Sequence, residues 1–304
     1  MNAPQQIGIE GDVETRMQEA LQAQRESYLK EGAVSAETRI DRIDRAIDVL
    51  VRYGEKVSDA LNSDFTCRPR EVNMLTDVVG SIGAMKHAKK HLRKWMKPEK
   101  RPTVFPLNLL GGRSRIEYQP KGVVGVVAPW NFPVSMVFHP MSGILAAGNR
   151  VMIKPSEFTP ATSEVIAEMI ADVFDPTEAT VFTGGPEVGQ AFSGLPFDHM
   201  IFTGATGIAR HIMAAASRNL VPVTLELGGK SPVIISRSAD IDKAVQRIML
   251  GKTMNAGQIC LAPDYLMVPE EKLNEVIESA QKAVAEMYPK LLDNDQYTSV
   301  VNER

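Results

Sequence analysis

Cys260 is the residue whose surroundings best suit nucleophilic chemistry. It closes the segment 255–260 (NAGQIC) and is followed by Leu-Ala-Pro. A cysteine in a glycine-containing turn with polar neighbours can reach a substrate, whereas one embedded in an apolar face cannot. Cys67, in the segment 64–69 (DFTCRP), lacks such a context and is interpreted as structural. A structural role is also open for Cys260, because buried free cysteines are common.

Glu226 is the candidate for a general base. It lies in the segment 225–232 (LELGGKSP), between Leu225 and Leu227 at the end of an apolar run. A carboxylate in such a strand end is expected to be partly desolvated, which would raise its pKa and suit it to activating water. A buried ion-pair partner is an equally good interpretation of the same residue.

Asn131 is the candidate for an oxyanion donor. It stands between two aromatic residues and two prolines in the segment 129–133 (PWNFP). Prolines restrict the backbone, so the side-chain amide is held as a fixed hydrogen-bond donor, as stabilisation of an oxyanion requires. A tight turn with an asparagine cap remains the alternative.

Two further segments suit a dinucleotide. Lys154 and Glu157, in the segment 154–157 (KPSE), suit the hydroxyls of a ribose, and the carboxylate would disfavour a 2′-phosphate. The segment 202–207 (FTGATG) precedes a predicted helix, so its glycines and the helix N-terminus favour a pyrophosphate. A strict G-x-G-x-x-G pattern is absent here and around Gly185 and Gly189. A charged turn and a structural glycine turn therefore remain open.

Metal binding is not predicted. His87 and His91 lie four residues apart, as two ligands on one helix face would, but lysines surround them and no third ligand is in view. We interpret this basic stretch as a solvated helix face.

The elements that position these residues alternate in type. Helical periodicity covers most of the first hundred residues, and afterwards apolar runs alternate with amphipathic stretches, which predicts an α/β fold with a parallel sheet flanked by helices. In such sheets ligands bind beyond the carboxyl ends of the strands. The predicted strands are 123–128, 151–153, a run ending at 183, 200–202 and 221–225, and the predicted helices are 136–147, 161–174, a short one near 188, and 206–217.

Composition narrows the class of function. The 304 residues are 44% apolar and 23% charged with a net charge of −3, which is typical of a globular protein and speaks against nucleic-acid or membrane-surface partners. No basic stretch followed by an apolar block begins the chain, and no apolar run could span a bilayer, so a cytoplasmic location is expected. Two cysteines are too few for a secreted disulfide scaffold.

The five segments taken together, in their order along the chain (PWNFP, KPSE, FTGATG, LELGGKSP and NAGQIC), resemble the aldehyde dehydrogenase family from about residue 35 to the last residue. The resemblance implies that Cys260 is the nucleophile, Glu226 the general base and Asn131 the oxyanion donor in the oxidation of an aldehyde through a thioester. It also implies NAD, with NADP as an alternative, and a small-molecule aldehyde as substrate. The implied cofactor contacts are Trp130, Lys154, Glu157, Gly185, Gly189, Phe202, Gly204, Ala205, Thr206, Leu227 and Gly228. Ala205 stands where relatives often carry serine, which removes one hydroxyl contact to the pyrophosphate.

The resemblance also divides the chain. It implies an N-terminal helical part of the cofactor domain (1–108), an oligomerisation arm or hairpin (109–122), a Rossmann-like NAD-binding domain (123–228) and the start of a catalytic domain (229–304). The segment 260–265 (CLAPDY) is similar to the branch of fatty-aldehyde and coniferyl-aldehyde dehydrogenases, which favours a hydrophobic or aromatic aldehyde, coniferyl aldehyde first.

Family members continue beyond this point, through a Glu-x-Phe-Gly-Pro segment that contacts the nicotinamide ribose and through a C-terminal strand used in oligomerisation. The resemblance therefore implies a chain truncated at its C-terminus, whose full-length form is a homodimer or homotetramer. We expect the 304-residue form to turn over poorly or not at all. Two other functions fit the same residues: a cofactor-independent cysteine esterase, and a non-catalytic nucleotide-binding fragment.

Overall fold

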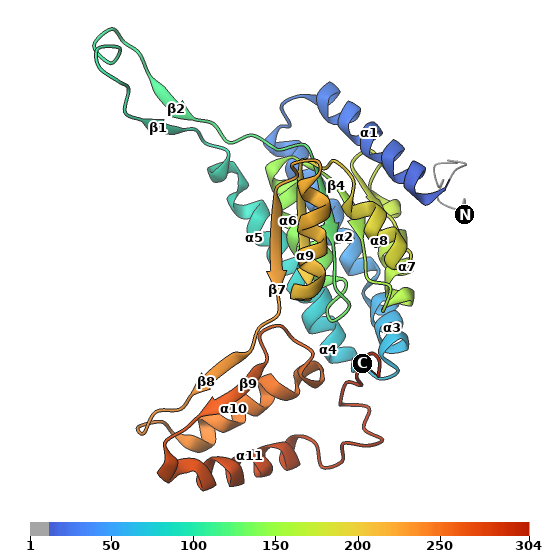
Figure 1. The fold of residues 1–304 in the computed structure, drawn as a ribbon, viewed down its shortest axis with the longest axis vertical. Helices are drawn as coiled ribbons and strands as arrows, with labels where there is room; N and C mark the ends of the chain where they lie inside the picture. Colours follow the sequence, from blue (N-terminus) through green and yellow to red (C-terminus); the bar gives the residue numbers. More distant parts are fainter. Residues whose placement is uncertain (1–11, 304) are drawn as a thin grey trace.

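A five-stranded parallel sheet forms the centre of the larger part of the molecule (Figure 1). The computed structural model describes residues 12–303. The strand order is β5-β4-β3-β6-β7, so the chain builds outward from β3 on one side and returns to build outward on the other. The predicted alternation of strands and helices is confirmed. The strands are β3 (Val123–Val127), β4 (Arg150–Lys154), β5 (Ala179–Val181), β6 (His199–Gly204) and β7 (Val223–Leu227), and the helices between them are α6 (Ser135–Ala147), α7 (Pro160–Val173), α8 (Pro186–Ser193) and α9 (Thr206–Ser217).

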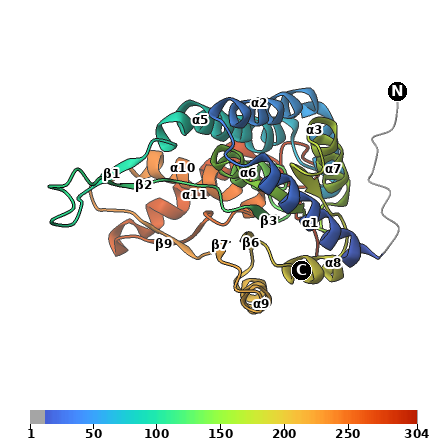
Figure 2. The same cartoon turned by 90° about the horizontal axis from the view of Figure 1, so that it is seen from above.

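Both faces of this sheet are covered, which explains the nearly continuous apolar runs of its central strands. Successive side chains of a strand point to opposite faces. Val124 and Val126 of β3 therefore join one core cluster, whereas Val123 joins the other. Figure 2 shows α2 and α5 on one side of the strands and α8 and α9 on the opposite side.

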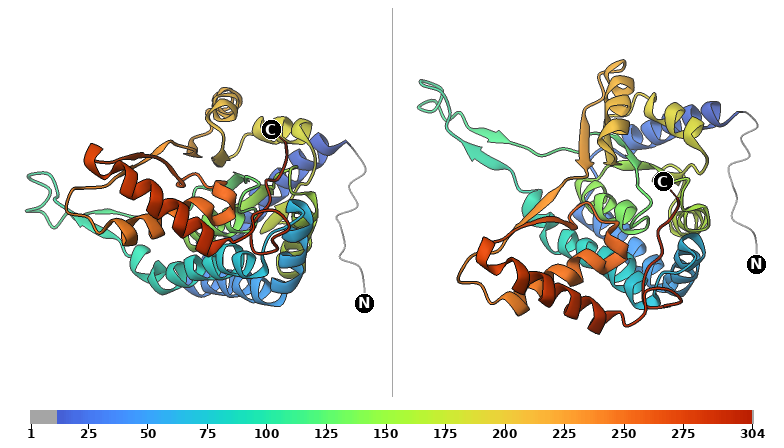
Figure 3. Two further views of the ribbon diagram at one scale, coloured as in Figure 1. Left: turned by 90° about the horizontal axis from the view of Figure 1, so that it is seen from below. Right: turned by 60° about the horizontal axis from the view of Figure 1, so that its bottom comes forward.

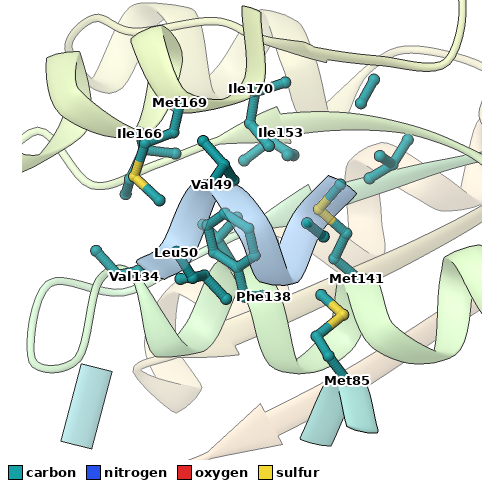
Figure 4. Close-up of a cluster of buried hydrophobic side chains, with 14 of the residues drawn as sticks. Val49, Leu50, Met85, Val134, Phe138, Met141, Ile153, Ile166, Met169 and Ile170 are labelled. Carbon is teal, nitrogen blue, oxygen red and sulfur yellow. The ribbon is translucent and has the colours of Figure 1, made fainter. Parts of the chain in front are cut away.

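The larger core lies under helices from the N-terminal part of the chain. In Figure 4, Phe138 and Met141 of α6 meet Leu50 of α2, Met85 of α5 and Ile153 of β4, all of them buried. The side chains of Asp12 and Ser35 cap the first two helices by accepting hydrogen bonds from backbone amides of the first turn. The helices are α1 (Val13–Glu31), α2 (Ala36–Arg52), α3 (Gly54–Phe65), α4 (Arg70–Asn73) and α5 (Gly80–Trp95), and a π-helical segment, η1 (Met74–Val79), joins α4 to α5.

A two-stranded antiparallel hairpin projects from the molecule (Figure 1). Its strands are β1 (Glu99–Arg101) and β2 (Ser114–Ile116), with Lys100 opposite Arg115. The arm therefore begins before the predicted segment 109–122. The sequence did not reveal β1 because Glu99–Arg101 is charged throughout and lacks the polar–apolar alternation that is typical of a half-exposed strand.

A second, smaller unit follows β7. Its two parallel strands pack on two helices around a small core that includes Ile241, Val245 and Val276. After α11 the chain leaves this unit and returns to the first one (Figure 3), where the backbone N–H of Ser299 donates to the carbonyl of Cys67 at 2.8 Å. The elements are β8 (Ser231–Ile234), α10 (Ile241–Thr253), η2 (Met254–Gly257), β9 (Pro263–Met267), η3 (Glu270–Lys272) and α11 (Leu273–Met287). Across residues 12–303, no helix is both long enough and apolar enough to cross a bilayer.

Candidate active site

The strand order changes direction between the neighbouring strands β3 and β6, which is the point where open α/β sheets bind their ligands. Chain connections leave these two neighbouring strands in opposite directions across the sheet, so their carboxyl ends flank the point where ligands bind in open α/β sheets. Val127 at the end of β3 pairs with both Lys154 and Phe202. The predicted segments 129–133, 154–157 and 202–207 therefore emerge at one edge of the sheet, as expected from the sequence.

Asn131 lies in the turn between β3 and α6, half-buried, and reaches the segment that precedes Cys260. Its side-chain Nδ2 donates to the backbone carbonyl of Gln258 at 2.9 Å. In return, Nδ2 of Asn255 donates to the backbone carbonyl of Asn131 at 3.2 Å. The structure thus brings together Asn131 and the turn before Cys260, which are far apart in the chain.

The turn before Cys260 has an unusual backbone. Asn255 and Ala256 both adopt the left-handed conformation, with φ of 51° and 53°, and Gly257 follows with φ of 75°. Side chains other than asparagine rarely adopt this conformation, and runs of it occur where surrounding contacts enforce them. Asn255 is buried, whereas Cys260 is exposed, so the turn presents the thiol to solvent from a fixed base.

A buried ion pair supports the turn that carries Asn131. Asp77 lies in η1 and accepts backbone hydrogen bonds from Val134 and Ser135, each at 3.1 Å, through Oδ1. Its Oδ2 contacts the guanidinium of Arg68 at 2.9 Å, and both side chains are fully buried. The same guanidinium lies over the ring of Phe132, 5.2 Å from its centre. Burial lowers the pKa of Arg68, although the charge of Asp77 opposes this effect. Asp77 thereby anchors the turn at the first residues of α6.

Glu226 is exposed, so the desolvation predicted from its sequence neighbours is wrong for this chain. Leu225 and Leu227 pack toward the smaller core of the sheet, but strand alternation turns Glu226 to the opposite face. β7 is an edge strand, and nothing within residues 12–303 hydrogen-bonds or ion-pairs with the Glu226 carboxylate. Flanking leucines in a strand do not surround the residue between them.

Lys154 and Glu157, for which the sequence predicted contacts to a ribose, form an ion pair with each other at the end of β4. Lys154 is buried, and its Nζ donates to the Pro155 carbonyl at 2.7 Å and to Glu157 at 3.1 Å. A Cβ placed on Gly189 would lie 4.0 Å from the Lys154 side chain, so the glycine leaves open space beside it. Gly185 caps α8 without a side-chain hydrogen bond.

The segment after β6 presents an uncapped helix. Ala205 precedes α9 and offers no side-chain cap, so the first amides of α9, beginning at Thr206, are available to an anion. Gly204 lies against the buried Phe202 ring, which a Cβ at this position would approach to 2.6 Å. Leu227 pairs with Gly204 across the sheet, and Gly228 follows it, exposed.

This edge fits a dinucleotide. Two uncapped helix N-termini with glycines, those of α8 and α9, follow β5 and β6, and a buried ammonium group lies at the end of β4. The ring of Trp130, which follows β3, lies 6.4 Å from that of Phe65 and packs against the larger core. In the part of the chain that the structure describes, no group of three or more histidine, cysteine or acidic residues could hold a metal ion.

Three residues that support the site, Asp77, Asn255 and Gln258, were not recognised from the sequence. Asn255 had one signal, since asparagine before a glycine-containing turn tolerates a left-handed backbone. Asp77 had none, because its partners Arg68 and Val134 become neighbours only when η1 packs beside α6.

The comparisons with known proteins agree with this arrangement. A model of the aldehyde dehydrogenase family matches residues 6–304. The chain is 55% identical over 306 residues to a probable coniferyl aldehyde dehydrogenase of Caulobacter vibrioides, covering 100% of this chain and 63% of that protein. The substrate-bound state of Staphylococcus aureus AldH superposes with a TM-score of 0.88 at 35% identity, over 93% of this chain and 62% of that one.

A further solved structure, a Mycobacterium tuberculosis aldehyde dehydrogenase complexed with NAD+, superposes with a TM-score of 0.81 at 28% identity, over 90% of this chain and 56% of that one. The chain thus spans about 60% of the length of the relatives it matches. The match of the family model to nearly the whole sequence, together with the ordered segments at the carboxyl edge of the sheet, shows that the chain belongs to the aldehyde dehydrogenase family.

Proposed function

We propose that the chain carries the nucleophile and the cofactor site of an enzyme that oxidises a hydrophobic or aromatic aldehyde, coniferyl aldehyde first, to the carboxylic acid. The observation that carries the proposal is the bond from Asn131 Nδ2 to the Gln258 carbonyl, two residues before the exposed Cys260. This bond supports the proposal because it holds an amide donor against the backbone two residues from Cys260, and addition to a carbonyl requires both a nucleophile and an oxyanion donor. Similarity to a probable coniferyl aldehyde dehydrogenase supports the substrate class.

Each residue has one task in this reaction. The Cys260 thiolate adds to the aldehyde carbonyl, and the oxyanion accepts hydrogen bonds from Asn131 Nδ2 and the Cys260 backbone N–H. A bound nicotinamide supplies the acceptor for the hydride that leaves this carbon. The acyl group then remains on Cys260 as a thioester, and Glu226 takes a proton from the water that hydrolyses it.

NAD is the cofactor that the edge of the sheet favours. Lys154 and Glu157 would contact the hydroxyls of the adenosine ribose, and the Glu157 carboxylate would repel a 2′-phosphate, which makes NADP the weaker ligand. We further propose that Gly185, Gly189, Gly204, Thr206, Leu227 and Gly228 approach the pyrophosphate and nicotinamide, and that Trp130, Phe202 and Ala205 lie in the segments beside the cofactor. We also propose a cytoplasmic location and a homodimer or homotetramer in which the projecting hairpin contacts another subunit.

The test is intact-protein mass spectrometry after mixing the chain with NAD and coniferyl aldehyde. The expected result is an acyl adduct on Cys260 that is absent in Cys260→Ala and longer-lived in Glu226→Gln. Formation of the adduct from an ester but never from an aldehyde with NAD would favour the cysteine esterase. Binding of NAD without any adduct would favour a nucleotide-binding fragment.

A further inference from the structure

Gln258 closes the turn before Cys260 by hydrogen bonds to Asn255, the first residue of that turn. Its backbone N–H and its side-chain Nε2 both donate to the carbonyl of Asn255, at 3.0 and 2.9 Å. Its own carbonyl accepts from Asn255 Nδ2 at 3.3 Å and from Asn131 Nδ2 at 2.9 Å. The left-handed conformation of Asn255 and Ala256 is therefore enclosed by hydrogen bonds that all meet at Gln258.

The side chain of Gln258 also holds a distant segment. Its Nε2 donates to the carbonyl of Ser299 at 3.1 Å, and its Oε1 accepts from the N–H of Val301 at 3.0 Å. A primary amide that pairs with two backbone groups of one segment has its plane and direction restricted by that segment. The segment 299–301, together with the Asn255 carbonyl, thus orients the side chain of Gln258.

This segment is itself docked on the first unit. The N–H of Ser299 donates to the Cys67 carbonyl at 2.8 Å, Thr298 is buried, and Val301 packs against the larger core. Cys67 is followed by Arg68, whose buried pair with Asp77 supports the turn of Asn131. The adjacent residues Cys67 and Arg68 therefore contact both supports: the segment that binds Gln258 and the Asp77 that binds the turn of Asn131.

The carbonyl of Gln258 controls how Asn131 can act. An asparagine Nδ2 carries two hydrogens, and one of them is directed at this carbonyl. Fixing one N–H of a planar amide fixes the direction of the second, which is the one that remains for an oxyanion. If the carbonyl moves, the donor turns away from the substrate even though Asn131 is unchanged.

We propose that Gln258 is a positioning residue that couples the docked segment 299–301 to the Asn131 amide, so that this segment sets the oxyanion donor of the site. The inference rests on the roles proposed above for Cys260 and Asn131. It assigns to the side chain of Gln258 an effect on carbonyl chemistry and none on the nucleophilicity of the thiol itself.

Two reactions of Cys260 separate these effects. With p-nitrophenyl acetate, the thiolate adds to the ester carbonyl, the tetrahedral oxyanion collapses, the C–O bond breaks and p-nitrophenolate leaves, so a thioester forms through an oxyanion. With iodoacetamide, the thiolate displaces iodide from a methylene carbon and no oxyanion develops. Because loss of a single oxyanion donor slows acyl transfer by about 100-fold or more, we expect Gln258→Met to slow acylation by about tenfold and to leave alkylation within about twofold.

Two comparisons make the test specific. Gln281→Met, an equivalent change on an exposed position of α11, should leave both rates unchanged. In an Asn131→Ala background, Gln258→Met should have no further effect on acylation, because the donor that it positions is gone.

A reciprocal variant tests the segment without touching Gln258. Val301→Pro removes the N–H that Gln258 Oε1 accepts, whereas Val301→Ala keeps that N–H and trims only the side chain. We expect Val301→Pro to slow acylation as Gln258→Met does, with alkylation unchanged, and Val301→Ala to behave like the parent chain in both reactions.

Three outcomes would overturn the proposal. Equal slowing of acylation and alkylation in Gln258→Met would mean a general structural role, and additive effects of Gln258→Met and Asn131→Ala would mean that the two act independently. Equal acylation rates in Val301→Pro and Val301→Ala would mean that the segment 299–301 does not act on the site through Gln258. Failure of the proposed function would be seen differently. If acylation persisted in Cys260→Ala, Cys260 would not be the nucleophile, whatever the effect of Gln258→Met.

Discussion

Asn255 donates its side-chain amide to the backbone carbonyl of Asn131 across a gap of 3.2 Å. Because Asn131 Nδ2 donates back to the carbonyl of Gln258 at 2.9 Å, the turn after β3 and the turn before Cys260 are bonded in both directions. This reciprocal contact joins the sheet to the smaller unit at the candidate active site. The unusual backbone of the nucleophile's turn and the position of the candidate oxyanion donor are therefore one structural feature.

Asn255→Ala is expected to destabilise the protein more than Asn255→Gly. Both variants lose the hydrogen bonds of the buried amide, but only alanine keeps a Cβ in the left-handed backbone at φ of 51°. The difference in the free energy of unfolding should be about 1 kcal/mol in favour of glycine, the strain that an ordinary side chain adds in this conformation. Urea unfolding monitored by circular dichroism measures it. Equal stabilities would show that the turn relaxes when its asparagine is lost.

Removal of one partner of the buried pair Arg68–Asp77 should be strongly destabilising. Asp77→Ala leaves a buried guanidinium unpaired and frees the amides of Val134 and Ser135, so the free energy of unfolding should fall by about 3–5 kcal/mol. The double variant Arg68→Met/Asp77→Asn removes the charge together with its partner and should lose less. The midpoints and slopes of urea unfolding for the parent chain, Asp77→Ala and the double variant measure these differences in stability.

A surface pair provides the control for this experiment. Arg70 and Glu55 also form an ion pair, but both side chains are largely exposed. Glu55→Gln should therefore leave the urea midpoint unchanged, because water and salt screen such pairs. A large effect at Glu55, or a double variant as unstable as Asp77→Ala, would contradict the burial argument.

Glu178 should stabilise the fold in a pH-dependent manner. Burial raises its pKa, but the hydrogen bonds and charges of Arg45 and Arg42 outweigh burial and lower the pKa from 4.5 to about 2. The folded-state pKa lies below that of the unfolded chain, so the stabilisation is fully present above pH 4.5 and is lost as the pH falls toward 2. Allowing for partial screening by solvent, Glu178→Gln should lower the free energy of unfolding by about 2 kcal/mol at neutral pH.

Urea unfolding of both proteins at neutral pH and at several values below pH 4.5 tests this window. The difference between parent and variant should shrink steadily as the pH is lowered. Asp41→Asn is the matched control, because Asp41 also pairs with Arg45 but its side chain is 65% exposed. A difference that stays constant with pH would assign the effect of Glu178→Gln to packing instead of charge.

Substitution of Gly204 and of Gly207 by alanine should change the stability of the protein in opposite directions. A Cβ on Gly204 would lie 2.6 Å from the buried Phe202 ring, so Gly204→Ala should cost about 1–3 kcal/mol through overpacking. Gly207 lies in α9 with nothing within 4 Å of its Cβ position, so Gly207→Ala should stabilise by about 0.5–1 kcal/mol through helix propensity. Thermal midpoints of the two variants check both signs. Two shifts in the same direction would refute the steric argument.

Much of the fold could be predicted from local pattern. Apolar runs at 123–128 and 151–153 separated by amphipathic stretches indicated parallel strands with helical crossovers, and both strands are present as β3 and β4. β1 could not be found in this way, since its three charged residues form a strand only by pairing with β2. The desolvation of Glu226 was predicted wrongly for a related reason: neighbours in sequence say little about which face of a strand is covered.

By itself, the sequence determined the α/β class, the alternation of elements and the identity of the residues that could do chemistry, because periodicity and residue type are local properties of the chain. Only the tertiary structure decided which of these residues meet. The exposure of Glu226 and the bonds from Gln258 to Asn131, Ser299 and Val301 depend on segments that are distant in sequence and are brought together by packing. Non-local hydrogen bonds of this kind leave no periodic signal, so the support of the candidate site could be found only in three dimensions.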